Sequence, residues 1–120
     1  MHADQFETRL ARVRHRFATT LESKIADAVV TADRMSRGDD GGIEHVSESY
    51  RRLHGICGIG PTVGFLATGE AARFAEAALI QAHHEKRRLS ERELTSLKKA
   101  LATLRAAAAA ELRLMYGRGG

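Results

Sequence analysis

Apolar residues recur every three or four positions along most of this chain, which is the spacing of amphipathic helices. The first such segment runs from about residue 3 to about residue 36. Its apolar positions are Phe6, Leu10, Val13, Phe17, Leu21, Ile25, Ala28, Val29, Ala32 and Met35. The pattern predicts one long helix, or two helices joined by a bend near Thr19 and Thr20, where two β-branched residues adjoin. The glycine-rich sequence from Gly38 to Gly42 then predicts a turn.

A second helix is predicted to begin near Ile43. Its apolar positions step by three or four residues and are Ile43, Val46, Tyr50, Leu53 and Cys57. At about 100° per residue they share one narrow face, so we expect Tyr50 to pack in the core and Cys57 to be a small buried hydrophobe. His54 lies roughly 80° from the centre of that face, on its rim. Pro61 is expected to kink or loosen the helix.

Two further helices follow. The third is predicted to start after Gly64 and to fade between His83 and Lys86, with an inner face of Phe65, Thr68, Ala72, Ala75, Leu79 and Ala82. The fourth begins at a capping box, in which Ser90 and Glu93 satisfy each other's backbone amides. Its apolar positions are Leu94, Leu97, Leu101, Leu104, Ala108, Leu112 and Met115. Residues 117–120 are expected to form a disordered tail.

Four amphipathic segments with short connections predict an all-α fold, an antiparallel up-down four-helix bundle over residues 1–116, with a long N-terminal helix or a bent helix pair. A chain of 120 residues fits a single domain. Cys57 is the only cysteine, so no disulfide can form within the chain and a reducing, cytoplasmic compartment is expected. No run of eighteen apolar residues is present, and the N-terminal residues carry charge rather than a signal-peptide core, so no membrane association is expected.

The chain is basic, with a net charge of +4 and a pI of about 9.7. Its two short basic runs comprise Arg9, Arg12, Arg14 and Arg16, and Lys86, Arg87 and Arg88. Because these charges are dispersed among helix-surface positions, we interpret them as solvated faces and do not expect nucleic acid to bind. A basic helical protein associated with nucleic acid is the alternative, and strong, salt-dependent DNA binding would favour it.

The surroundings of His54 carry the clearest functional signal. Five glycines lie between positions 55 and 69 in a chain that otherwise has helical patterning. Each costs about 1 kcal/mol relative to alanine inside a helix, which indicates a surface that another molecule must approach closely. Histidine can act as a nucleophile near neutral pH, so this pattern predicts group transfer at an exposed histidine.

The segment His54-x-x-x-Gly58-x-Gly60-x-x-x-Gly64-Phe65 resembles the signature of histidine phosphotransfer (HPt) domains. Members of this family are helical bundles of about this length that carry a phosphoryl group between receiver domains of two-component phosphorelays. The resemblance covers residues 6–113 and is strongest from His54 to Leu79. It implies that His54 is the phosphoacceptor.

The resemblance also implies the partners and the supporting residues. Response-regulator receiver domains and a sensor (hybrid) histidine kinase are expected to act on a monomeric carrier, docking over Ser47, Arg51, Gly55 and Gly58. The receiver supplies Mg²⁺, so no cofactor is expected on this chain. Because no Gly-rich nucleotide loop is present, the protein is expected to be a phosphohistidine carrier without autokinase activity.

One position departs from the family pattern. Many members have lysine just before the first motif glycine, where this chain has Cys57, so Arg51, one turn before His54, is the candidate cation, with Cys57 and Gly58 lining the site. A register that places Arg51 at the family's histidine and Gly55 at its glycine leaves nine residues to Gly64 instead of six, and we reject it. The departure leaves open a catalytically silent bundle that docks on a receiver.

A metal site is not predicted. The adjacent histidines at positions 83 and 84 point about 100° apart on a helix. No cysteine or carboxylate set in the sequence completes four ligands around them.

Overall fold

Four α-helices and one short 3₁₀ helix account for most of the chain. The computed structural model describes residues 2–38 and 42–117. Its elements are α1 (His2–Ser36), α2 (Gly42–Ile59), η1 (Pro61–Val63), α3 (Leu66–Glu85) and α4 (Glu91–Tyr116). The described residues contain no strand, and the predicted all-α class is confirmed. The middle of the predicted turn and most of the predicted tail lie outside the described residues.

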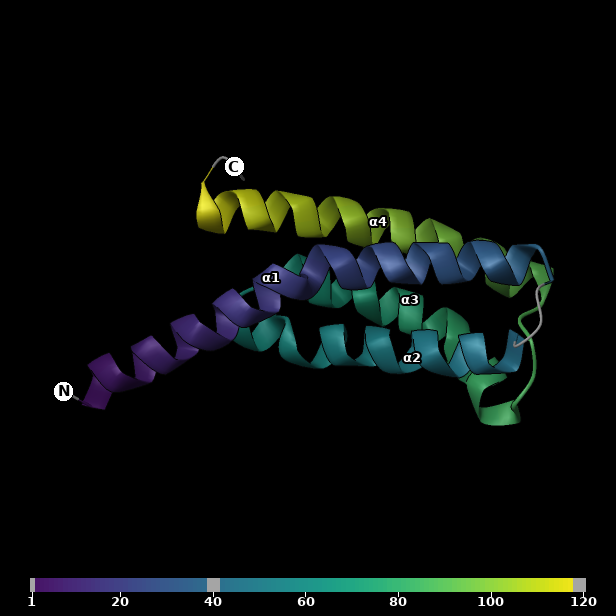
Figure 1. Cartoon of the computed structure of the whole chain (residues 1–120), viewed down its shortest axis with the longest axis horizontal. Helices are drawn as coiled ribbons and strands as arrows, with labels where there is room; N and C mark the ends of the chain where they lie inside the picture. Colours follow the sequence, from purple (N-terminus) through teal and green to yellow (C-terminus); the bar gives the residue numbers. More distant parts are fainter. Residues whose placement is uncertain (1, 39–41, 118–120) are drawn as a thin grey trace.

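The helices form a bundle in which α1 packs against α2 and α4, and α3 packs against α2 and α4 (Figure 1). Short connections make consecutive helices antiparallel. At 1.5 Å per residue, the 35 residues of α1 span about 52 Å, close to the 53 Å long axis of the molecule. Its N-terminal part therefore projects past one end of the bundle. No helix of the described residues has the length and apolar character to cross a membrane.

The first helix is continuous, so of the two predicted alternatives the single long helix is observed. The hydroxyl of Thr19 donates to the carbonyl of Arg16 at 2.9 Å, and that of Thr20 donates to the carbonyl of Phe17 at 3.3 Å. Hydroxyls bonded in this way bend helices without breaking them. Figure 1 shows the N-terminal part of α1 at an angle to the remainder. The first turns of α1 extend past the other helices, and Phe6 is 66% exposed although the pattern predicted an inward position. Closer to the bend, the rings of His15 and Tyr116 of α4 lie 6.4 Å apart.

The core lies between the four helices, and the predicted inner face of α3 is fully buried. The prediction for α2 is wrong in part. Its buried positions are Gly42, Val46, Ser49, Leu53 and Ile56. Ile43 is exposed, and Tyr50 and Cys57 are only half-buried. The buried face is rotated by about 60° from the predicted one, because α2 packs against α1 and α3 together and turns its face between them.

The start of α4 has the predicted capping box. Ser90 Oγ accepts the Glu93 amide at 3.1 Å, and Glu93 Oε1 accepts the Ser90 amide at 2.8 Å. Arg87 donates two further hydrogen bonds to the Glu93 carboxylate, at 2.8 and 3.0 Å. These bonds, chiefly those from Arg87, lower the pKa of Glu93 to about 2. Part of the second basic run therefore stabilises the α3–α4 connection.

The N-terminus of α3 is capped by a residue from another helix. Phe65 at the cap position provides no side-chain hydrogen bond. Glu111 of α4 instead accepts the amides of Ala67 at 3.0 Å and Thr68 at 2.8 Å, and also the Thr68 hydroxyl at 2.6 Å. Thr68 is fully buried, so this carboxylate satisfies groups that water does not reach. The contact fixes the start of α3, which carries half of the candidate site.

Candidate functional site

His54 lies on the outer surface of α2, beside α3, and its side chain is 67% exposed. Its Nδ1 atom is 3.0 Å from Oε2 of Glu76, a carboxylate on α3 that is only 15% exposed. A carboxylate can only accept, so Nδ1 donates and carries the proton. The second nitrogen, Nε2, then holds the lone pair of the neutral ring, and it has no hydrogen-bond partner among residues 2–38 and 42–117. The imidazole is therefore oriented with one nucleophilic nitrogen free.

A row of aromatic rings continues from His54 along the α2–α3 junction. The Tyr50 ring is nearly parallel to the His54 ring, at 13°, with centroids 5.7 Å apart. Tyr50 also stacks on His83, with centroids 4.3 Å apart, and His83 Nδ1 lies 3.2 Å from Ser47 Oγ. Tyr50 therefore packs against the core only in part, with its ring also next to His54. Glu76 and His83 were not identified from the sequence as neighbours of His54.

The five glycines near His54 fall into two groups. A Cβ atom at Gly55 or Gly58 would meet no atom within 4 Å, so the space above both is open. At Gly69 a Cβ would lie 2.5 Å from Cγ of Pro61, and at Gly60 it would lie 2.8 Å from a backbone oxygen. Gly55 and Gly58 thus add no side chain to the surface beside His54.

The remaining three serve the turn between α2 and α3. Gly64 has a φ of 100°, a left-handed conformation that favours glycine. Together with the close contacts at Gly60 and Gly69, this conformation lets the chain turn back at η1. The interpretation that all five glycines admit another molecule is therefore too broad.

The other predicted site residues lie on the same flank of α2 in different environments. Arg51 is exposed and forms no hydrogen bond or ion pair with a described residue, whereas Arg52 pairs with Glu48 at 3.0 Å. Cys57 is a half-buried free thiol. Ser47 is half-buried, with its hydroxyl near His83. The surface open to a partner therefore consists mainly of Arg51, His54 and the two exposed glycines.

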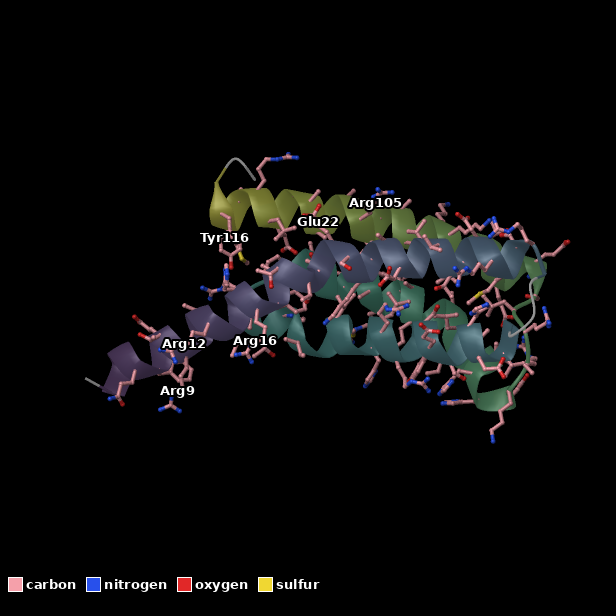
Figure 2. All side chains as sticks on the ribbon, viewed as in Figure 1. Arg9, Arg12, Arg16, Glu22, Arg105 and Tyr116 are labelled. Atoms are coloured by element: carbon pink, nitrogen blue, oxygen red, sulfur yellow. The ribbon has the colours of Figure 1, made fainter. Side chains whose placement is uncertain are left out.

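In the first basic run, one arginine forms a tertiary hydrogen bond and the other three are exposed to solvent. Arg14 donates from Nε to the carbonyl of Val63 at 2.8 Å, which joins α1 to η1. Arg9, Arg12 and Arg16 are exposed on the N-terminal part of α1, on the side away from α4 (Figure 2). Within the described ranges, no group of three or more His, Cys, Asp or Glu residues is placed to hold a metal ion.

A separate apolar groove lies between α1 and α4 and is lined by residues that include Val29, Ala32, Leu101 and Ala102. Because α4 does not pack against α2, this groove is on another face from His54. The candidate site is thus an exposed surface of the α2–α3 pair with one oriented imidazole. No family model matches the chain, and no curated protein and no solved structure is similar to it.

Proposed function

We propose that this protein is a histidine phosphotransfer carrier, in which His54 accepts a phosphoryl group from a phosphorylated receiver domain and passes it to another. The observation that supports this most directly is the pair formed by His54 and Glu76 on an exposed surface of the bundle. It leaves Nε2 free beside open space above Gly55 and Gly58.

The transfer needs little from this chain beyond an oriented nucleophile. The Nε2 lone pair of His54 attacks the phosphorus of the receiver's aspartyl phosphate, forming an N–P bond as the O–P bond breaks. The electron pair of the broken bond leaves on the aspartate carboxylate. Phosphoryl transfer depends mainly on positioning and charge compensation, and the receiver's Mg²⁺ provides part of the latter.

Glu76 has two roles in this proposal. The Nδ1 proton stays on the ring during transfer, so the phosphorylated ring becomes a cation, and the Glu76 carboxylate at 3.0 Å stabilises that charge. The same hydrogen bond, with Tyr50 stacked on one face of His54, limits rotation of an otherwise exposed ring. Such orientation reduces the entropy lost on reaching the transition state.

The partner surface in this proposal is the exposed flank of α2. A receiver docks over Arg51, His54, Gly55 and Gly58, because the two glycines leave open space beside the histidine. A sensor (hybrid) histidine kinase supplies phosphate earlier in the relay, and this chain acts as a carrier without kinase activity of its own.

The test mixes the purified protein with a panel of phosphorylated receivers and measures acid-labile label. Wild-type protein is expected to be labelled, and His54→Gln is expected to lose the label while keeping its helical circular dichroism. His84→Gln is the matched control, because His84 is also an exposed histidine of the α2–α3 pair. Undiminished labelling of His54→Gln refutes the assignment, and receiver binding without label indicates a silent docking bundle instead.

A second variant tests the docking surface. Gly58→Trp adds a large side chain where a Cβ meets nothing within 4 Å, so the variant should fold and yet block the receiver sterically. Transfer at the wild-type rate would show that the receiver docks elsewhere.

A further inference from the structure

A phosphoryl group on His54 brings negative charge to a surface where the family's lysine is replaced by Cys57, which is half-buried and uncharged as a thiol. Arg51 is one candidate cation, on the outer flank of α2. The neighbouring helix supplies a second, and the inference about it rests on the proposed function of His54.

The contacts between α2 and α3 fix their register. His54 meets Glu76, and Ser47 meets His83. The two contacts are separated by seven residues on each helix. The residue numbers rise along α2 as they fall along α3, as expected for antiparallel neighbours. Continuing by three residues past His54 and Glu76 places Arg73 of α3 level with position 57, where the family has its lysine.

The surroundings of Arg73 leave its side chain available. It is exposed, while Ala72 and Ala75 beside it are fully buried, so it lies on the outward flank of α3. At 100° per residue it is about 60° around the helix from Glu76. It forms no hydrogen bond or ion pair with any residue of the described ranges. By the same register, Gly58 of α2 is level with Ala72, next to Arg73, and it contributes no side chain to obstruct the guanidinium.

We propose that Arg73 contacts the phosphoryl group on His54 and replaces the family's lysine from the opposite helix. Its guanidinium can reach over Gly58 and donate two parallel N–H hydrogen bonds to phosphoryl oxygens, a geometry that a lysine ammonium does not provide. Together with Arg51, it brackets the phosphoryl group between two cations that come from different helices.

The experiment uses phosphoramidate, a small donor that phosphorylates histidine without a receiver. Its P–N bond breaks, ammonia leaves, and an N–P bond forms at Nε2 of His54. The half-life of the phosphohistidine and the rate of labelling are measured for wild type, Arg73→Ala, Arg73→Lys and Arg105→Ala. Arg105 is the charge-matched control, since it is exposed on α4, at the edge of the molecule opposite α2 (Figure 2).

Arg73→Ala should slow labelling or shorten the half-life by roughly two- to fivefold, the range of an exposed charge interaction. Arg73→Lys should recover part of the loss, and Arg105→Ala should match wild type. Alanine favours helix and position 73 is exposed, so the variant is expected to fold, which its thermal unfolding checks. As a readout besides rate, the Arg73 Nε–H NMR signal should shift when wild type is phosphorylated.

The outcomes separate the two proposals. If wild type is labelled on His54 but Arg73→Ala behaves like Arg105→Ala and the Arg73 signal does not move, the assignment of Arg73 is overturned and the phosphoacceptor stands. If wild type takes no label on His54, the phosphoacceptor is refuted, and the role of Arg73 with it.

Discussion

The carboxylate of Glu111 offers the sharpest test of how the site is supported. Replacing it with alanine removes three hydrogen bonds at the start of α3, two from backbone amides and one from the Thr68 hydroxyl. It also removes a negative charge from a helix N-terminus, where the macrodipole favours one. The substitution should leave the core side chains in place, because Glu111 itself is only half-buried.

The expected loss of stability depends on which hydrogen-bond donors stay buried without a partner in the Glu111→Ala variant. The amide of Ala67 is near solvent and regains a bond to water, but the amide and hydroxyl of Thr68 belong to a fully buried residue. A buried donor without a partner costs about 1–3 kcal/mol, and such costs are not fully additive. Glu111→Ala should therefore lower the free energy of unfolding by about 2–3 kcal/mol. For a domain of this size that corresponds to a fall in Tm of roughly 10 °C.

Urea denaturation followed by circular dichroism measures this change, provided that the m-value is the same for both proteins. Glu70→Ala is the matched control, because Glu70 is an exposed carboxylate on α3, the helix that Glu111 caps, and should change stability by about 0.5 kcal/mol or less. A loss below about 0.5 kcal/mol for Glu111→Ala would refute the reasoning, since it would mean that water or another group replaces the carboxylate at no cost.

Three further predictions concern the cap, the glycines and the ring stack. Because the folded-state pKa of Glu93 is about 2, below its usual 4.5, the carboxylate stabilises the fold above pH 4.5 and loses this effect as pH falls towards 2. The stability difference between wild type and Glu93→Gln, about 1 kcal/mol near neutral pH, should therefore shrink in acid urea titrations. Gly69→Ala should destabilise by about 1–3 kcal/mol, because its Cβ overlaps Pro61, whereas Gly55→Ala should stabilise by about 0.5–1 kcal/mol in the same titration. Tyr50→Leu should slow phosphoramidate labelling of His54 more than Tyr50→Phe does, and equal rates would show that the stacked ring does not position the histidine.

Local sequence patterns were sufficient to predict the helices of the fold. The capping box at Ser90 is formed by residues three apart, so it can be identified without tertiary structure. The inner face of α3 follows from periodicity in the same way, whereas periodicity left open whether the N-terminal segment forms one helix or two. The face of α2 was misplaced because Ile43 and Ile56 are equally apolar, and only packing against two neighbours decides which is buried.

The candidate site was predicted only in part. The sequence predicted an exposed His54, but because the buried face of α2 is rotated from the predicted one, His54 lies farther from the core than the expected rim position. Its partner Glu76 is 22 residues away, and Glu111 is 43 residues from Thr68. Contacts over such separations depend on the register and rotation of whole helices, which periodicity leaves undetermined. The sequence also offers Arg73, three residues before Glu76, as a local ion-pair partner, so it did not single out the contact with His54.

The small side chains on the buried face of α3 affect how close this helix lies to α2, and therefore the hydrogen-bond distance between His54 and Glu76. Alanines at 71, 72, 75 and 82 are buried, and helices approach more closely where their contacts are small. A hydrogen bond of 3.0 Å is lost when its atoms separate by about another half ångström. A single added methylene group at the α2–α3 contact displaces a helix by a comparable amount. The buried alanine side chains of α3 therefore help to set the helix separation on which the exposed His54–Glu76 hydrogen bond depends.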